Sequence, residues 1–201
     1  EPGLNRVTCQ NMRLFISGSA PLLIETFRTW QQHTGHTILE RYGMSETTML
    51  TSNPFVPDDR YCDLSGIPQS DRRGGTVGFP LPGVGLRVVG DHGEPIEAGE
   101  IGGIQVKGPN VFRGYWRMPE KTAEEVTADG WFKTGDVGQV DAQGYVTIVG
   151  RSKDLIISGG YNVYPAEIEG YINEMTGVAE SAVVGVPHPD FGEGVVAVVV
   201  A

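Results

Sequence analysis

The chain has 201 residues, of which 39% are hydrophobic and 20% charged, so it has the composition of a globular protein with room for one large domain or parts of two. Its formal net charge of −10 disfavours binding to nucleic acid or to an anionic membrane surface, and no apolar stretch reaches the ~18–20 residues of a membrane span. The only cysteines, Cys9 and Cys62, fit neither a metal site nor a disulfide framework, which indicates a reducing, cytoplasmic environment.

The first part of the chain predicts a parallel α/β arrangement. Residues 12–16 are typical of a short strand, and apolar residues recur at helical spacing over 22–34. Gly35 suits the C-terminal end of that helix. A second strand is predicted over 37–42, with a turn at Gly43.

The remainder predicts mostly antiparallel β structure. Residues 52–78 read as a loop rich in proline and glycine, and short alternating runs predict strands at 85–89, 103–107 and 144–149, with a short helix at 119–127 between them. After a domain boundary near Lys153, an apolar segment, a helix and two strands predict a small α+β domain; they cover 155–157, 166–175, 181–186 and 194–201.

Tyr42-Gly-Met-Ser-Glu46 directly follows a predicted strand. A glycine beside a hydroxyl and a carboxylate suits a phosphate site, because the backbone can approach closely, Ser45 can donate to an oxygen and Glu46 can hold Mg²⁺. The alternative is a plain turn in which Ser45 caps the N-terminus of a following helix.

Two further runs carry candidate binding residues. Ser17-Gly-Ser-Ala-Pro21 lies between strand and helix, where free N–H groups attract anions, although it lacks P-loop spacing and could be an ordinary turn. In Trp131-Phe-Lys-Thr-Gly-Asp136, the carboxylate of Asp136 could accept hydrogen bonds from vicinal hydroxyls such as those of ribose. The alternative is an aspartate in a β-turn.

The fourth run is Val149-Gly-Arg-Ser-Lys-Asp154, followed by Ser158-Gly-Gly-Tyr161. Gly159 and Gly160 would let the backbone approach a thin ligand, and Arg151 offers several donors to hydroxyl or phosphate oxygens. An interdomain linker with solvated charges explains the same residues equally well.

Taken in order and spacing, these four runs and Gly108-Pro-Asn-Val-Phe-Arg-Gly-Tyr-Trp116 resemble the adenylate-forming superfamily of acyl-CoA synthetases, firefly luciferase and peptide-synthetase adenylation domains. Residues 13–22, 40–44 and 192–194 are most similar to malonyl-CoA synthetases. The resemblance implies an α/β and β-rich mixture in which residues 1–152 are the C-terminal portion of the large AMP-binding domain. That portion divides into an α/β segment at 1–70 and a β-barrel-like segment at 71–152, and the start of a small C-terminal α+β domain follows at 153–201.

The resemblance also implies roles for single residues. Ser19, Ala20, Pro21, Tyr42 and Gly43 would surround the adenine, with Tyr42 stacked on the base. Ser45, where the family usually has threonine, would bond the adenylate phosphate, and Glu46 would bind Mg²⁺. Met44 would touch the acyl group. Asp136 and Arg151 would hold the ribose. Lys153 would be the hinge of the small domain, and Ser158, Gly159, Gly160 and Tyr161 would line the coenzyme A channel.

The reaction that the resemblance implies joins a small carboxylic acid, malonate above all, to AMP with release of pyrophosphate, and then transfers the acyl group to coenzyme A. It belongs to fatty acid metabolism. The lysine loop for the outer phosphates and the C-terminal lysine motif of the family are expected upstream of Glu1 and downstream of Ala201, so the chain is expected to be an inactive internal fragment. A non-catalytic adenylate-binding or scaffold module and an enzyme that loads a carrier protein stay open, as does the oligomeric state.

Overall fold

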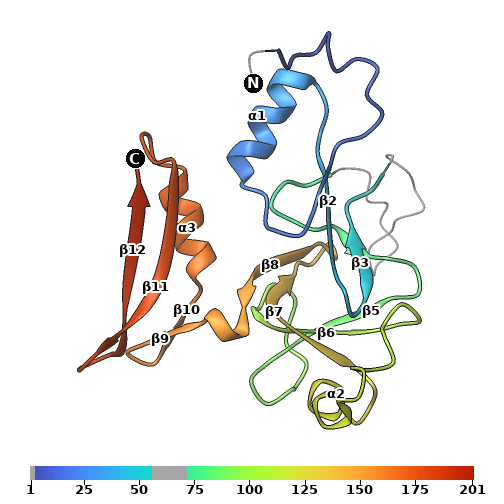
Figure 1. Ribbon diagram of the computed structural model, residues 1–201, viewed down its shortest axis with the longest axis vertical. Helices are drawn as coiled ribbons and strands as arrows, with labels where there is room; N and C mark the ends of the chain where they lie inside the picture. Colours follow the sequence, from blue (N-terminus) through green and yellow to red (C-terminus); the bar gives the residue numbers. More distant parts are fainter. Residues whose placement is uncertain (1–2, 56–71) are drawn as a thin grey trace. The chain divides into compact units, whose positions relative to one another are not determined.

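The protein forms two compact units in a computed structural model that describes residues 3–55 and 72–201 (Figure 1). Unit 1 comprises Glu1–Thr134 and Gly138–Ile148, and unit 2 comprises Gly135–Val137 and Val149–Ala201. Cys62 and most of the predicted 52–78 loop lie outside the described residues. Each unit is described by itself, and the domain division at residues 152 and 153 stays a prediction.

Unit 1 begins with a small α/β sheet of strand order β1-β2-β3-β4. Its elements are β1 (Ile16–Ser17), α1 (Ile24–Thr34), β2 (Leu39–Met44), β3 (Thr48–Ser52) and β4 (Phe79–Pro80). The strand β1 pairs with β2 in parallel, whereas β2–β3 and β3–β4 are antiparallel, so the predicted strand–helix–strand unit is confirmed. Gly35 ends α1 in a left-handed conformation with φ 74°, as predicted.

Two details of this sheet differ from the prediction. The first strand is only two residues long, because only Ile16 and Ser17 find ladder partners on β2. The turn predicted at Gly43 comes later, since β2 continues to Met44. The register shifts between Tyr42 and Gly43, and a Cβ on Gly43 would lie 2.0 Å from the carbonyl oxygen of Thr48. Glycine is therefore required by the close approach of the two strands rather than by a turn.

The second sheet has the order β5-β6-β7-β8. It consists of β5 (Gly85–Val89), β6 (Gly102–Lys107), β7 (Phe132–Val140) and β8 (Val146–Arg151), and the short helix α2 (Pro119–Glu125) precedes β7. The predicted strands and helix are confirmed, but the long strand β7 was missed. Its two internal glycines, Gly135 and Gly138, and its polar residues conceal the alternation of buried and exposed positions in its first half.

The core of unit 1 joins the two sheets. Leu50 on β3 packs with Ile104 and Val106 on β6 and with Phe132 on β7, and all four are at most 2% exposed. Partly buried residues of the β2–β3 hairpin, Tyr42 and Met44 among them, pack against this cluster. The hairpin is thus anchored in the hydrophobic core, which fixes where its turn lies.

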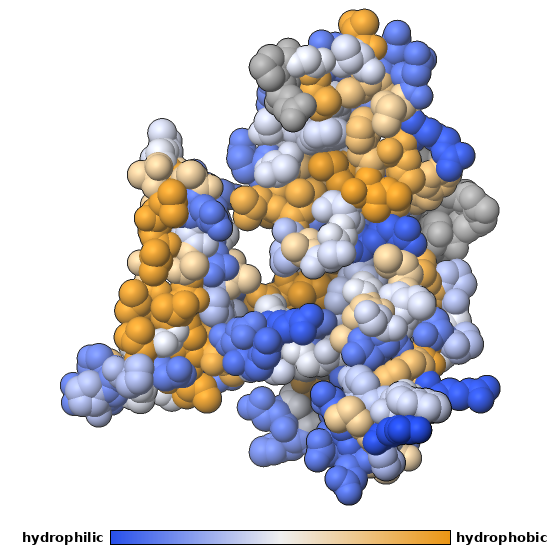
Figure 2. Space-filling view, in the orientation of Figure 1, coloured by the Kyte–Doolittle hydropathy of each residue, from blue (hydrophilic) through white to orange (hydrophobic). Residues whose placement is uncertain are grey.

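Unit 2 contains a four-stranded antiparallel sheet of order β10-β9-β12-β11. Its elements are the 3-10 turn η1 (Ser152–Asp154), β9 (Ile156–Ser158), β10 (Tyr161–Val163), α3 (Pro165–Asn173), β11 (Glu180–His188) and β12 (Gly192–Val200). The helix α3 contacts β11, where Glu169 Oε1 accepts a hydrogen bond of 2.7 Å from the N–H of Val183. The predicted α+β character is confirmed, and Figure 2 shows the apolar surface that β11 and β12 expose.

Among residues 3–55 and 72–201, no helix is both long enough and apolar enough to cross a membrane.

Candidate functional site

Two of the predicted binding runs lie at the same edge of the first sheet. Ser17 on β1 is the parallel partner of Glu40 on β2, so the residues that follow these two strands leave the sheet side by side. A Cβ on Gly18 would lie 3.2 Å from the carbonyl oxygen of Arg41, which confirms that the backbones approach closely. The structure therefore places the 19–21 loop next to the strand that carries Tyr42.

The loop itself is exposed and conformationally strained. Ser19, Ala20 and Pro21 are all exposed, and Ser19 has φ 70°, a left-handed conformation that residues other than glycine rarely adopt. A strained exposed residue at a strand-to-helix turn is a common feature of binding sites.

The predicted phosphate and Mg²⁺ residues occupy a hairpin turn. Ser45, Glu46 and Thr47 connect β2 to β3, and the N–H of Thr47 donates to the carbonyl of Met44 over 3.1 Å. Ser45 is exposed, while Glu46 is half-buried. The alternative in which Ser45 caps a helix is wrong, because the residues from Thr48 onward form a strand that pairs with β2.

A distant segment, residues 110–115, holds the backbone of this turn. The side-chain amide of Asn110 donates to the carbonyl oxygens of Thr47 and Met49 over 2.8 and 3.1 Å. The N–H of Phe112 donates to the carbonyl of Glu46 over 2.7 Å. Three carbonyl groups of the turn and the strand after it thus have fixed partners.

The same segment also contacts the carboxylate of Glu46. The hydroxyl of Tyr115 donates to Glu46 Oε1 over 3.2 Å. The pKa of Tyr115 is raised, first by burial, then by this hydrogen bond and by the charges of Glu46 and Glu125. Asn110 and Tyr115 had no role in the sequence prediction, although the Gly108–Trp116 run that contains them had been singled out.

Glu46 can serve as a metal ligand only together with other donors. The described residues contain no group of three or more His, Cys, Asp or Glu side chains placed to hold a metal ion. Mg²⁺ is commonly held by one or two carboxylates together with the phosphates of a substrate, so a single carboxylate on a turn fits Mg²⁺.

Glu40, which lies just before the Tyr42 run, is another residue that sequence reasoning missed. Its side chain is 6% exposed, and its Oε2 accepts a hydrogen bond of 3.2 Å from the N–H of Gly75. Burial raises its pKa from 4.5 to about 7, although hydrogen bonds from the backbone of Gly75 and Leu22 oppose that rise. Glu40 therefore connects the start of α1 to the 72–78 loop.

In unit 2, Asp136 and Arg151 form an ion pair. Arg151 Nε lies 3.1 Å from Asp136 Oδ1, and the two side chains are 55% and 6% exposed, respectively. Asp136 lies within β7, so the alternative of an aspartate in a β-turn is wrong. A buried carboxylate beside a more exposed guanidinium offers both acceptors and donors to a hydroxyl-rich ligand.

The other predicted residues of unit 2 lie in η1 and the β9–β10 hairpin. Lys153 is exposed in η1. Ser158 pairs with Tyr161, and Gly159 and Gly160 form the two-residue turn between them with φ 58° and 85°. Two positive φ values identify the turn type that suits a tight hairpin, so this glycine pair has a structural reason that is independent of its predicted role in binding.

The chain belongs to the AMP-binding enzyme family, because a profile of that family matches more than half of it. The profile of that family, described as AMP-binding enzyme, matches residues 4–116. The profile described as AMP-binding enzyme C-terminal domain matches residues 167–201.

The chain is similar to CoA ligases in particular. It is 42% identical to a malonate–CoA ligase of Arabidopsis thaliana over 96% of this chain and 29% of that protein. It is 41% identical to a probable CoA ligase, CCL8, of Humulus lupulus over 95% of this chain and 30% of that protein. The chain thus spans about 30% of the length of these curated relatives.

Solved structures agree with this assignment. The crystal structure of ATP-bound MatB from Rhodopseudomonas palustris is 57% identical, with a TM-score of 0.90 over 99% of this chain and 37% of that one. A malonyl-CoA ligase in a ternary product complex with methylmalonyl-CoA and AMP is 42% identical, with a TM-score of 0.61 over 100% of this chain and 40% of that one. The predicted fold is confirmed, while the roles of the single site residues stay predictions.

Proposed function

We propose that the complete protein containing this chain is an AMP-forming acyl-CoA synthetase that activates malonate with ATP and transfers the malonyl group to coenzyme A. The observation that carries this proposal is the 57% identity to ATP-bound MatB, which extends over 99% of this chain. The similarity to malonate–CoA ligases favours malonate over other small carboxylic acids. The 201 residues alone are proposed to be insufficient for the whole reaction.

In this proposal the sheet edge of unit 1 receives the nucleotide. Ser19, Ala20 and Pro21 border the adenine, and the ring of Tyr42 stacks on it with the help of the close backbone at Gly43. The exposed hydroxyl of Ser45 donates to the phosphate of the adenylate. Met44, the last residue of β2, borders the acyl group.

Glu46 is proposed to bind Mg²⁺ together with phosphate oxygens of ATP. The metal, when bound, neutralises negative charge on the phosphates during attack at the α-phosphate. Glu46 contributes one charged ligand at a turn whose backbone is already fixed, so little reorganisation is needed when the nucleotide binds. In unit 2, Asp136 accepts hydrogen bonds from the ribose hydroxyls, and Arg151 orients this carboxylate through their ion pair.

The thioester-forming half-reaction is proposed to use other residues of unit 2. Lys153 acts as the hinge of the small domain, because a few residues that absorb backbone rotation are sufficient for such a motion. Ser158 and Tyr161 flank the glycine turn and border the pantetheine of coenzyme A. No atom lies within 4 Å of a Cβ built on Gly160, which supports a close approach of a thin ligand there.

The cellular setting is part of the same proposal. A malonyl-CoA synthetase supplies fatty acid metabolism with an activated two-carbon donor, and the charge and cysteine usage of the chain are consistent with the cytoplasm. The 1–152 segment is proposed to belong to the large domain and the 153–201 segment to the small one.

The test is pyrophosphate release by the complete protein with ATP, Mg²⁺ and a set of carboxylic acids. Malonate should give the highest kcat/KM, and product analysis should show malonyl-CoA and AMP. Replacement of coenzyme A by a phosphopantetheinyl carrier protein separates a CoA ligase from a carrier-loading enzyme. Absence of pyrophosphate release with every carboxylate would refute the proposal.

A further inference from the structure

The carboxylate of Glu46 has a partner that comes from far along the chain. Tyr115 is 69 residues away in the sequence, and its hydroxyl donates to Oε1 of Glu46 over 3.2 Å. An ionised carboxylate has about four acceptor positions, so one hydrogen bond restricts its orientation and leaves capacity for a cation. The contact therefore does not compete with metal binding by the same side chain.

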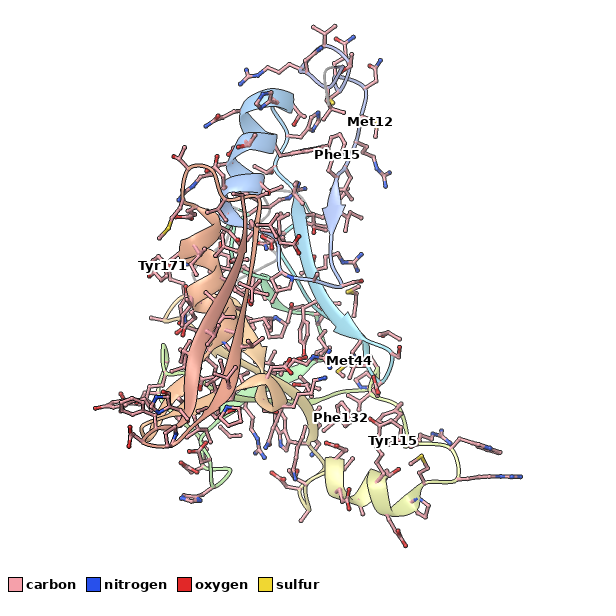
Figure 3. All side chains as sticks on the ribbon, turned by 60° about the vertical axis from the view of Figure 1, so that its left-hand side comes forward. Met12, Phe15, Met44, Tyr115, Phe132 and Tyr171 are labelled. Carbon is pink, nitrogen blue, oxygen red and sulfur yellow. The ribbon has the colours of Figure 1, made fainter. Side chains whose placement is uncertain are left out.

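Tyr115 is itself held firmly within unit 1. Its N–H donates to Thr122 Oγ1 over 3.0 Å, and its ring packs edge-on against Phe112 at a centroid distance of 4.8 Å. Phe112 in turn packs edge-on against Phe132, which is 2% exposed in the core. Figure 3 shows Tyr115 and Phe132 in the same part of unit 1 as Met44 at the end of β2. The hydroxyl is thus fixed relative to the core that anchors the hairpin.

The ring of Tyr115 has one further neighbour in unit 1. The Nζ atom of Lys121 lies 5.0 Å from the ring centroid, which places a cation over the ring.

We propose that Tyr115 is a positioning residue that orients the carboxylate of Glu46 for the cation that accompanies ATP. The inference rests on the proposed function, in which Glu46 binds Mg²⁺. Without the phenol, Glu46 can adopt more side-chain conformations, and the cation must order the carboxylate when it binds. A ligand that has to be ordered on binding has a weaker affinity than one that is already in place.

The experiment compares Tyr115→Phe with the wild type in the complete protein, measuring pyrophosphate release as a function of free Mg²⁺ concentration at saturating ATP and malonate. Phenylalanine keeps the ring contact with Phe112 and removes only the hydroxyl. Tyr171→Phe is the matched control, because Tyr171 on α3 is 76% exposed and has no role in the site.

The half-saturating Mg²⁺ concentration should rise about threefold to tenfold in Tyr115→Phe, the range expected for one hydrogen bond of ordinary net strength. The rate at saturating Mg²⁺ should return close to the wild-type value, and the KM for malonate should not change. A variant damaged only in its packing would lose rate at all Mg²⁺ concentrations.

Three results would overturn the inference: an unchanged Mg²⁺ dependence, a lower half-saturating concentration, or a loss of rate that Mg²⁺ does not restore. A lower value would show that the phenol competes with the cation. If the wild type itself releases no pyrophosphate, the proposed function fails. If the wild type is active and the two tyrosine variants behave alike, only the role of Tyr115 fails.

Discussion

Glu40 should make the stability of unit 1 depend on pH, and Glu40→Gln should remove that dependence. The carboxyl group is 6% exposed and accepts N–H groups from Gly75 and Leu22. Burial disfavours its charged form, and the two backbone donors offset this only in part, so its pKa rises from 4.5 to about 7.

The sign and size of the effect follow from this shift. Because the folded-state pKa is the higher one, the folded protein binds more protons than the unfolded chain between pH 4.5 and about 7. The contribution of Glu40 to stability is therefore complete below pH 4.5 and is lost as the pH rises through 7. At about 1.4 kcal/mol per pKa unit, the loss is at most about 3.5 kcal/mol.

The assay is urea unfolding followed by tryptophan fluorescence between pH 4.5 and 8. All three tryptophans, Trp30, Trp116 and Trp131, lie in unit 1, so the signal reports the unit that contains Glu40. The free energy of unfolding of the wild type should fall relative to that of Glu40→Gln by about 2–3 kcal/mol across this range. Glu120→Gln, a change of the same kind at an exposed position on α2, is the control.

A difference between wild type and Glu40→Gln that stays constant within about 0.5 kcal/mol from pH 4.5 to 8 would refute this reasoning. It would mean that the two backbone donors fully compensate for the burial of the charge. The same pH dependence in Glu120→Gln as in Glu40→Gln would show that general charge effects, and not Glu40, govern the result.

Three further changes test the hairpin, the core and the proposed ribose contact. Gly43→Ala should destabilise unit 1 by on the order of 3 kcal/mol in the urea assay, because its Cβ would lie 2.0 Å from a carbonyl oxygen of Thr48. Leu50→Ala should cost about 2–5 kcal/mol in the same assay, since Leu50 is 0% exposed at the centre of the core. Asp136→Asn should weaken AMP binding by the complete protein about tenfold in calorimetry, and unaltered binding would remove Asp136 from the site.

The elements that could be predicted from the sequence are those whose signals are local. The spacing of apolar residues located α1. Gly35 marked its end, because glycine adopts the left-handed conformation at a helix C-terminus with the least strain. The strand β5 was predicted with its observed bounds, Gly85–Val89, since alternation and flanking turns define a short strand well.

The elements that were missed depend on contacts that no local pattern shows. Within β7, position 138 must be glycine because a Cβ there would lie 2.3 Å from the carbonyl oxygen of Thr147 on the neighbouring strand. Within the sequence alone, the same glycine predicts a turn. The end of β2 was predicted too early for the same reason, since Gly43 serves strand packing and only resembles a turn signal.

The residues of the candidate site divide in the same way, into those with a local signal in the sequence and those that depend on distant contacts. Residues inside short motifs, such as Glu46 and Asp136, could be selected as candidates from their spacing and chemistry, and their roles stay predictions. Asn110 and Tyr115 could not be, because their partners on the turn lie more than 60 residues away and nothing near them in the sequence predicts which groups they meet. Glu40 was not selected either, because a buried strand is expected to carry apolar residues and gives no reason to select a carboxylate.

The substitution of Ser45 for the usual threonine can be judged from these contacts. The turn that presents Glu46 is held by the core that packs against β2 and β3. Asn110 donates to the carbonyl groups of Thr47 and Met49. The N–H of Phe112 donates to the carbonyl of Glu46, and the hydroxyl of Tyr115 donates to its carboxylate. The side chain of Ser45 takes no part in those bonds, and it is exposed. The geometry of the turn therefore does not depend on a β-branched residue at this position. Serine keeps the hydroxyl that the proposed phosphate contact requires, so the substitution is compatible with the proposed role of this position.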